Sequence, residues 1–151
     1  MSKPMTLREY IQIEWVTNYG KVLNIVSPWT ATHLSVEVIE ALGKIIKDDY
    51  DPFTKSKDKN DKCVYTFNKA LNTCPSLNCY NTITNMYGLV RSAFVHAGCS
   101  AIAITNAETE NLTGPNYVLS AKLLYQRVVD ACNFVCSNYP DRVDIPLLSA
   151  G

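Results

Sequence analysis

The feature that most constrains the fold is an apolar stretch from Met86 to Ile104, MYGLVRSAFVHAGCSAIAI. Of its nineteen residues, thirteen are hydrophobic and two are glycine, and the polar ones are Arg91, Ser92, His96 and Ser100. A membrane span needs about 20 apolar residues, and an arginine near its centre costs on the order of 2.5 to 3.5 kcal/mol. A helix that is apolar on all sides also fits the centre of a helical bundle. We therefore expect a buried central helix here, with His96 as a satisfied core residue.

Further helices are expected on both sides of this stretch. Apolar residues from Leu7 to Val26 recur mostly every three or four positions, which places them on one helical face. Ser27-Pro28 ends this segment, because a residue before proline avoids the α region. A second helix is expected to begin near Thr32 or Ser35. The remaining segments with helical character are residues 64–71, 76–85 and 117–139.

A charged segment, DPFTKSKDKNDK at 51–62, separates the first two helices from the rest. It carries seven charges in twelve residues and a proline, which is typical of a solvated loop. The chain of 151 residues is long enough for one domain with a real core. We expect a single all-α domain over residues 1–151, a helical bundle around the central helix, with no C-terminal membrane anchor.

Composition excludes two classes of partner. Lys and Arg total 14 and Asp and Glu total 14, so the formal net charge is zero. Nucleic acids and anionic lipid surfaces are bound through an excess of positive charge, so we expect neither. The N-terminal sequence MSKPMTLREYIQIEW lacks the charged-then-apolar pattern of a signal peptide. This predicts an intracellular protein with reduced cysteines.

No residue pattern indicates an enzyme or a metal site. Cys132 and Cys136 share one helical face, but a structural zinc ion needs four ligands, so we interpret both as small core residues. A cysteine–histidine nucleophilic pair stays open, because such partners meet only in the fold. The chain has no phosphate-binding glycine loop and no paired-carboxylate motif. We expect a binding protein that needs no cofactor, rather than an enzyme.

Two segments resemble motifs of the Bcl-2 family of apoptosis regulators. Tyr87-Gly88 stands where the family's first homology motif has tryptophan and glycine, VRSAFVHAG follows, and Gly98 matches a closing glycine. Upstream, the segment from Ile39 to Ile46 resembles the family's own BH3-type helix, and Tyr50 is in register with an aromatic residue that lines the family's groove. The order of features from Leu7 to Tyr139 also fits the family.

The chain departs from the family pattern at several positions. Leu89 occupies the place of the arginine that pairs with the ligand's aspartate, Met86 that of an asparagine, and Lys44 that of an acid. The second homology motif is not recognisable. Such drift in a short chain resembles viral homologues, for example one from an iridovirus. Without the arginine we expect modest affinity or few ligands, unless Arg91 or a lysine replaces it. Arg91 itself is expected to meet a ligand backbone or a core acid.

The resemblance implies a hydrophobic groove that sequesters BH3 helices of pro-apoptotic host proteins in the host-cell cytoplasm and so inhibits apoptosis. The groove is expected to be lined by Ile46, Tyr50, Phe53, Leu77, Tyr80, Tyr87, Gly88, Leu89, Arg91 and Ser92. The alternative is a helical viral structural or assembly protein whose apolar faces meet copies of itself. A homodimer fits either function, because a second copy can cover an exposed groove.

Overall fold

The computed structural model describes residues 3–47 and 63–147, and the statements below refer to these residues. They are mostly helical, in agreement with the expected class, and they add one pair of short strands. The charged loop expected at 51–62 lies outside the described residues. Among the helices that are described, none is both long and apolar enough to cross a membrane.

A helical run from Leu7 to Val22, called the N-terminal run below, begins the fold. It consists of α1 (Leu7–Tyr10), the π-helix η1 (Ile11–Asn18) and α2 (Tyr19–Val22). Thr6 and Glu9 start it with a capping box, in which each side chain accepts a hydrogen bond from the other residue's backbone N–H. The helix expected from residue 7 is therefore confirmed, although it ends at Val22.

The second helix, α3 (Pro28–Ile46), begins one turn earlier than expected. The Ser27 hydroxyl accepts a hydrogen bond of 3.3 Å from the backbone N–H of Thr30, which caps the helix. Pro28 occupies the first helical turn, where a backbone N–H has no partner within the helix. The same Ser-Pro pair that stops the first helix thus starts the second.

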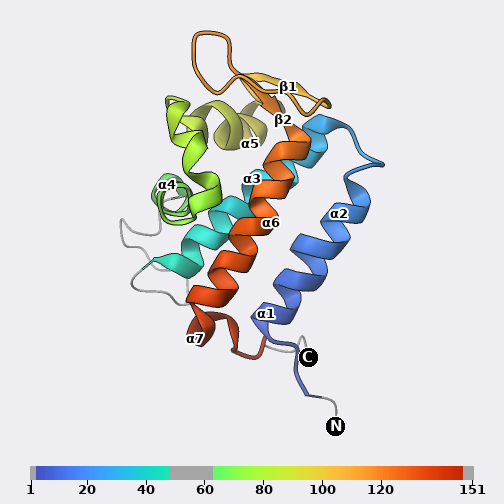
Figure 1. The fold of residues 1–151 in the computed structure, drawn as a ribbon, viewed down its shortest axis with the longest axis vertical. Helices are drawn as coiled ribbons and strands as arrows, with labels where there is room; N and C mark the ends of the chain where they lie inside the picture. Colours follow the sequence, from blue (N-terminus) through green and yellow to red (C-terminus); the bar gives the residue numbers. More distant parts are fainter. Residues whose placement is uncertain (1–2, 48–62, 148–151) are drawn as a thin grey trace.

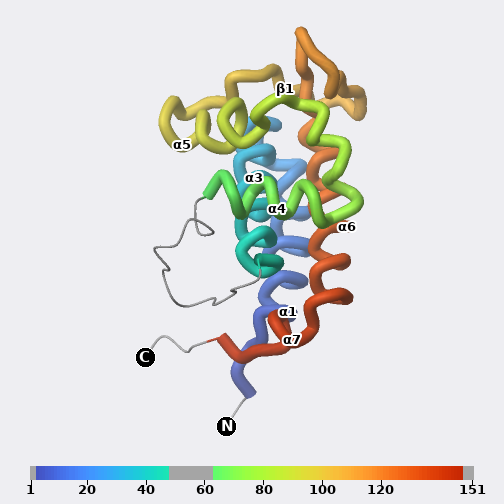
Figure 2. Tube along the Cα trace, turned by 90° about the vertical axis from the view of Figure 1, so that its left-hand side faces the viewer, coloured from blue at the N-terminus to red at the C-terminus, as the bar shows by residue number. Residues whose placement is uncertain are grey.

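The α3 helix lies at the centre of the molecule. Eleven of its nineteen residues are buried. In Figure 1 it runs beside α6 (Ala121–Asn138), with the N-terminal run on one side of this pair and α4 (Cys63–Thr73) on the other. Figure 2 shows α4 running across α3. Gly43 permits this crossing, because a Cβ there would lie 1.6 Å from the backbone oxygen of Thr66.

The prediction of a buried central helix over residues 86–104 is wrong in two respects. The helix does not extend through the second half of this stretch, and it does not lie at the centre of the molecule. The chain forms the π-helix η4 (Tyr87–Ser92) and then α5 (Ala93–Ala97). Gly98, with a φ of +75°, adopts the left-handed conformation that ends the helix. Val95 is 56% exposed, and His96 is exposed rather than a core residue. The central place that we expected for this stretch belongs to α3.

Two short strands follow, which the sequence did not indicate. The strands β1 (Ala103–Thr105) and β2 (Val118–Ser120) pair in parallel, and residues 106–117 project between them at the top of Figure 1. The last long helix therefore begins after β2, at Ala121, where the Ser120 hydroxyl caps it. A 3₁₀-helix, η3 (Pro75–Thr82), stands where a short helix over 76–85 was expected.

The C-terminal residues hold two helices in place. Within α7 (Pro140–Val143), Arg142 donates hydrogen bonds of 2.7 to 2.8 Å to the carbonyl oxygens of Ile45, Ile46 and Lys47 at the end of α3. These contacts satisfy carbonyls that have no partner inside the helix. Asp144 pairs with Arg8 of α1 through contacts of 2.6 and 3.0 Å.

Candidate partner-binding site

The ten residues expected to line a groove fall into three groups. Tyr50 and Phe53 lie outside the described residues. Three belong to the core and are at most 2% exposed: Ile46, Leu77 and Tyr80. Five lie together on η4 and are partly exposed: Tyr87, Gly88, Leu89, Arg91 and Ser92. The core group could meet a ligand only if helices moved apart, so the accessible part of the expected site is η4.

Tyr80 belongs to a polar network that joins three elements. Its hydroxyl accepts a hydrogen bond of 3.0 Å from Arg127 of α6, whose guanidinium also lies 5.4 Å from the centre of the tyrosine ring. Arg127 forms an ion pair of 2.6 Å with Glu110 in the loop between the strands. Burial raises the pKa of Tyr80, so the phenol is neutral at physiological pH. These contacts give Tyr80 a structural place between η3, α6 and the loop.

Arg91 meets a core acid, which is one of the two roles expected for it. Its Nε lies 3.4 Å from Oε1 of Glu40 on α3, and the two side chains are only 15% and 11% exposed. The two atoms attract one another as an ion pair but lack the geometry of a hydrogen bond. This pair fixes η4 against the central helix. Breaking a pair this deep leaves one charge without compensation.

Tyr87 links this ion pair to α4. Its ring packs edge-on against Phe67, with 5.6 Å between the ring centres. Burial raises the pKa of the Tyr87 phenol, the nearby Cys63 and Glu40 raise it further, and the positive charge of Arg91 lowers it. Tyr87 therefore stands between the first turn of α4 and the buried ion pair.

The first turn of α4, which brings Cys63 near Tyr87, leaves apolar side chains exposed. Val64 is 40% exposed and Tyr65 is 37% exposed. We call the surface formed by Cys63, Val64, Tyr65, Tyr87 and Arg91 the α4–η4 face. It combines the apolar surface of Val64 and Tyr65 with Arg91, whose side chain is 15% exposed and is paired with Glu40. The apolar part of such a surface can accept an apolar side chain from a partner helix.

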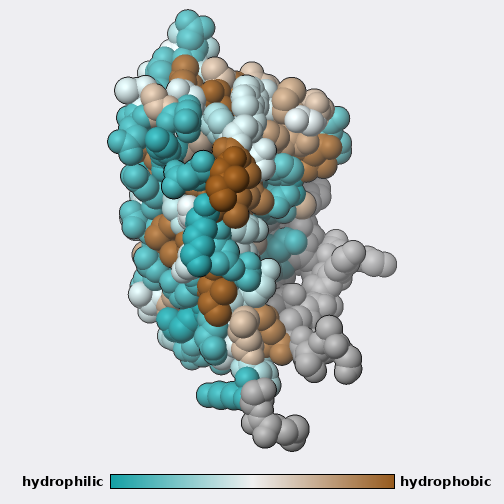
Figure 3. Space-filling view, turned by 90° about the vertical axis from the view of Figure 1, so that its right-hand side faces the viewer, coloured by the Kyte–Doolittle hydropathy of each residue, from teal (hydrophilic) through white to brown (hydrophobic). Residues whose placement is uncertain are grey.

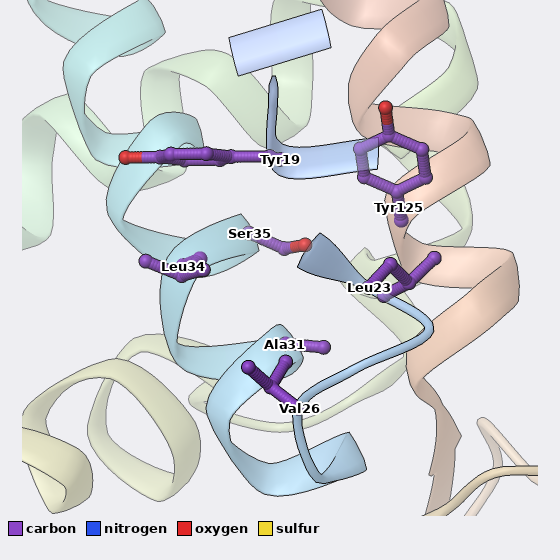
Figure 4. Close-up of a pocket in the computed structure, with 7 residues that line it drawn as sticks. All are labelled: Tyr19, Leu23, Val26, Ala31, Leu34, Ser35 and Tyr125. Carbon is purple, nitrogen blue, oxygen red and sulfur yellow. The ribbon is translucent and has the colours of Figure 1, made fainter. Parts of the chain in front are cut away.

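A small recess lies elsewhere, between the N-terminal run and the two long helices (Figure 4). It is lined by Tyr19, Leu23, Val26, Ala31, Leu34, Ser35 and Tyr125. None of these residues was among the expected site residues, because a gap between three elements leaves no pattern in the sequence of any one of them. The recess shares no residue with the α4–η4 face.

The two cysteines of α6 are core residues, as expected. Cys132 is fully buried and Cys136 is 4% exposed. Burial raises the pKa of both thiols, and that of Cys74 to about 12. Among the residues that the structure describes, no group of three or more His, Cys, Asp or Glu is arranged to hold a metal ion.

Comparison with known proteins finds no relative of this chain. No protein-family model, no curated protein and no solved structure matches the chain.

Proposed function

We propose that this chain captures an amphipathic helix of a partner protein on its α4–η4 face. The partner class is the one that the Bcl-2 resemblance implies: BH3 helices of pro-apoptotic host proteins, held in the cytoplasm of the host cell by a viral inhibitor of apoptosis. The observation that carries the proposal is the exposure of Val64 and Tyr65 on α4, the helix against which Tyr87 of η4 packs through Phe67. An apolar surface of this kind is what a helix with apolar residues at i, i+3 or i+4 and i+7 requires.

A calorimetric titration tests the proposal. The protein is titrated with a panel of BH3 peptides, each paired with a control peptide whose central leucine is changed to glutamate. We expect saturable micromolar or tighter binding to at least one peptide, lost in its control. The Val64→Glu variant should weaken that binding by about tenfold or more, since a charge on the contact surface must lose its hydration.

A matched variant on the opposite side of the molecule controls for changes in folding. Ile13 of η1 is 42% exposed, which is close to the exposure of Val64, and Figure 1 places the N-terminal run and α4 on opposite sides of the central pair. Ile13→Glu should therefore bind the peptide like the unmodified protein. Absence of binding to the whole panel, or equal losses in both variants, would contradict the proposal.

The alternative function, a helical viral structural protein that associates with itself, is supported by a different surface. Ile25 is 82% exposed and Val95 is 56% exposed, and neither belongs to the α4–η4 face. Sedimentation over a wide concentration range distinguishes the two functions. An assembly protein forms species that keep growing with concentration, whereas a helix-binding protein stops at a small discrete oligomer.

A further inference from the structure

One side of the molecule is built from a segment without acidic residues. Residues 63–107 contain no aspartate or glutamate, although the chain carries 14 in all. This segment forms α4, η3, η4, α5 and β1, and Figure 1 places α4 and α5 opposite the N-terminal run. Its basic residues are Lys69 and Arg91, which give it a formal charge of +2. The α4–η4 face lies entirely within this segment, so it offers no negative charge of its own.

Arg91 does not leave a free positive charge on this face, because Glu40 balances it. The two side chains form the ion pair of 3.4 Å described above. The other acidic residue of α3, Glu37, lies 3.0 Å from Nε2 of His33 on the same helix. Lys69 forms no ion pair with any residue of 3–47 or 63–147. The unbalanced positive charge of the segment is therefore the ammonium group of Lys69.

Lys69 lies one helical turn beyond the exposed apolar side chains of α4. Residues four apart share one side of a helix, so Lys69 follows Tyr65 and Asn68 follows Val64. Four residues span about 6 Å along the helix axis. Asn68 is exposed and Lys69 is partly exposed. The outer side of α4 thus changes from apolar in its first turn to polar, with one cation, in its second.

We propose that the helix captured on the α4–η4 face carries an acidic residue one turn from the apolar residue that contacts Tyr65, and that this acid pairs with Lys69. This requirement rests on the function proposed above and concerns the sequence of the partner. A carboxylate at this place is attracted by Lys69 and meets no like charge from residues 63–107, whereas a basic residue there is repelled. Charge thus selects among helices that present the same apolar residues.

A cycle of charge changes on both partners tests this pairing. The probes are the BH3 peptides that bind in the calorimetric titration, remade with each acidic residue changed in turn to glutamine or to lysine. They are titrated against the unmodified protein and against Lys69→Glu at about 50 mM salt, where charges are screened less than at physiological ionic strength.

The pairing predicts one acidic position in the peptide that is coupled to Lys69. Glutamine at this position should weaken binding to the unmodified protein by about two- to fivefold, as is typical of an exposed ion pair. Lysine there should weaken it further, because two like charges then meet. The Lys69→Glu variant should bind the lysine peptide more tightly than the original acidic peptide, which reverses the preference of the unmodified protein.

Lys21→Glu is the matched control, because it changes the net charge by the same amount as Lys69→Glu. Lys21 of α2 is exposed and lies on the opposite side of the molecule. Figure 3 shows the face of the N-terminal run, on which hydrophilic surface surrounds the apolar areas. We expect Lys21→Glu to bind each peptide within about twofold of the unmodified protein, since a distant exposed charge is largely screened.

The outcomes separate this pairing from the capture of a helix as such. Equal losses in Lys69→Glu and Lys21→Glu, or a panel in which no position is compensated by Lys69→Glu, would overturn the pairing and leave the capture standing. Absence of binding to the whole panel would contradict the capture and the pairing together. If Lys69→Glu fails to fold, Lys69→Gln replaces it and should remove the difference between the acidic peptide and its glutamine version.

Discussion

Two helical regions of this molecule are alike in spacing and differ in depth. The N-terminal run and α3 both place apolar residues at helical intervals, and each has a side-chain cap at its start. Yet α3 is buried by α4 and α6 together, while the run lies on the surface with Ile11 as its only fully buried residue. Helical periodicity thus identifies the inward face of a helix but does not say how many neighbours will cover the other faces.

The largest expected difference between the two regions concerns their glycines. In Gly43→Ala the new Cβ would lie 1.6 Å from the backbone oxygen of Thr66, so α3 and α4 must separate. We expect the free energy of unfolding to fall by about 3 kcal/mol. In Gly20→Ala the Cβ meets the Tyr125 hydroxyl at 2.5 Å, which is the far end of a side chain that can move. The hydrogen bond that this hydroxyl donates to the carbonyl oxygen of Val16 is lost, at a cost of about 1 kcal/mol, which is offset by a similar gain in helix propensity.

Urea unfolding followed by circular dichroism measures both variants under the same conditions. If the two regions differ in packing as described, the free energy of unfolding falls strongly in Gly43→Ala and changes by less than about 1 kcal/mol in Gly20→Ala. Equal losses in the two variants would show that the run is packed as tightly as the central helix, against the exposures described above.

The next effect concerns the end of α3. Arg142→Ala removes hydrogen bonds from a charged donor to the carbonyl oxygens of Ile45, Ile46 and Lys47. We expect a loss of about 2 kcal/mol in the free energy of unfolding, since hydrogen bonds to charged groups are worth about 1.5 to 3 kcal/mol. Arg142→Lys keeps the charge at the end of the helix and should recover part of the loss. A variant Arg142→Ala as stable as the unmodified protein would contradict this role.

The smallest effect concerns the ion pair at the start of the run. The hydrogen bond from Arg8 lowers the pKa of Asp144 below its ordinary value of 3.8. The pair therefore stabilises the folded run above pH 3.8, and this stabilisation is lost as the pH falls through the lowered pKa. Asp144→Asn should lower the hydrogen-exchange protection of the run at neutral pH and leave that of α3 unchanged.

In acid the two proteins should converge, because the carboxylate of the unmodified protein becomes protonated. Protection factors, which correct for the intrinsic pH dependence of exchange, provide this measurement. Equal protection of the run in both proteins at neutral pH would mean that the ion pair does not hold it.

The sequence allowed the helical class to be predicted but not the centre of the molecule. The stretch from residue 86 to 104 has thirteen hydrophobic residues, but Gly98 divides it into a helix and a segment that leads into β1. The centre is instead α3, which buries polar residues such as Thr32 and Ser35 because other helices pack on both sides of it. Burial of this kind depends on pairs of elements, such as Gly43 against Thr66, that no local pattern reveals.

Two other features of the fold were not predicted: the start of α3, whose signal was present in the sequence, and the two strands, which are too short to give one. Ser27-Pro28 was correctly interpreted as a helix stop, but its role as the start of the next helix was missed. Strands of three residues cannot show the alternation that identifies a strand. At the candidate site, Arg91 was expected to meet either a ligand or a core acid. The acid proved to be Glu40, an acidic residue among the buried positions of α3.

The loop over residues 106–117 has a consequence for handling this protein. Its ends are fixed by the parallel pairing of β1 and β2, Asn111 pairs with Val118 further along, and Thr113 and Gly114 are exposed between these two residues. The entropy of closing a flexible loop grows only with the logarithm of its length, so an insertion that doubles such a loop costs about 0.6 kcal/mol. An inserted peptide epitope or fluorescent label at this position would be carried at the end of the molecule away from α1 and α7 (Figure 1).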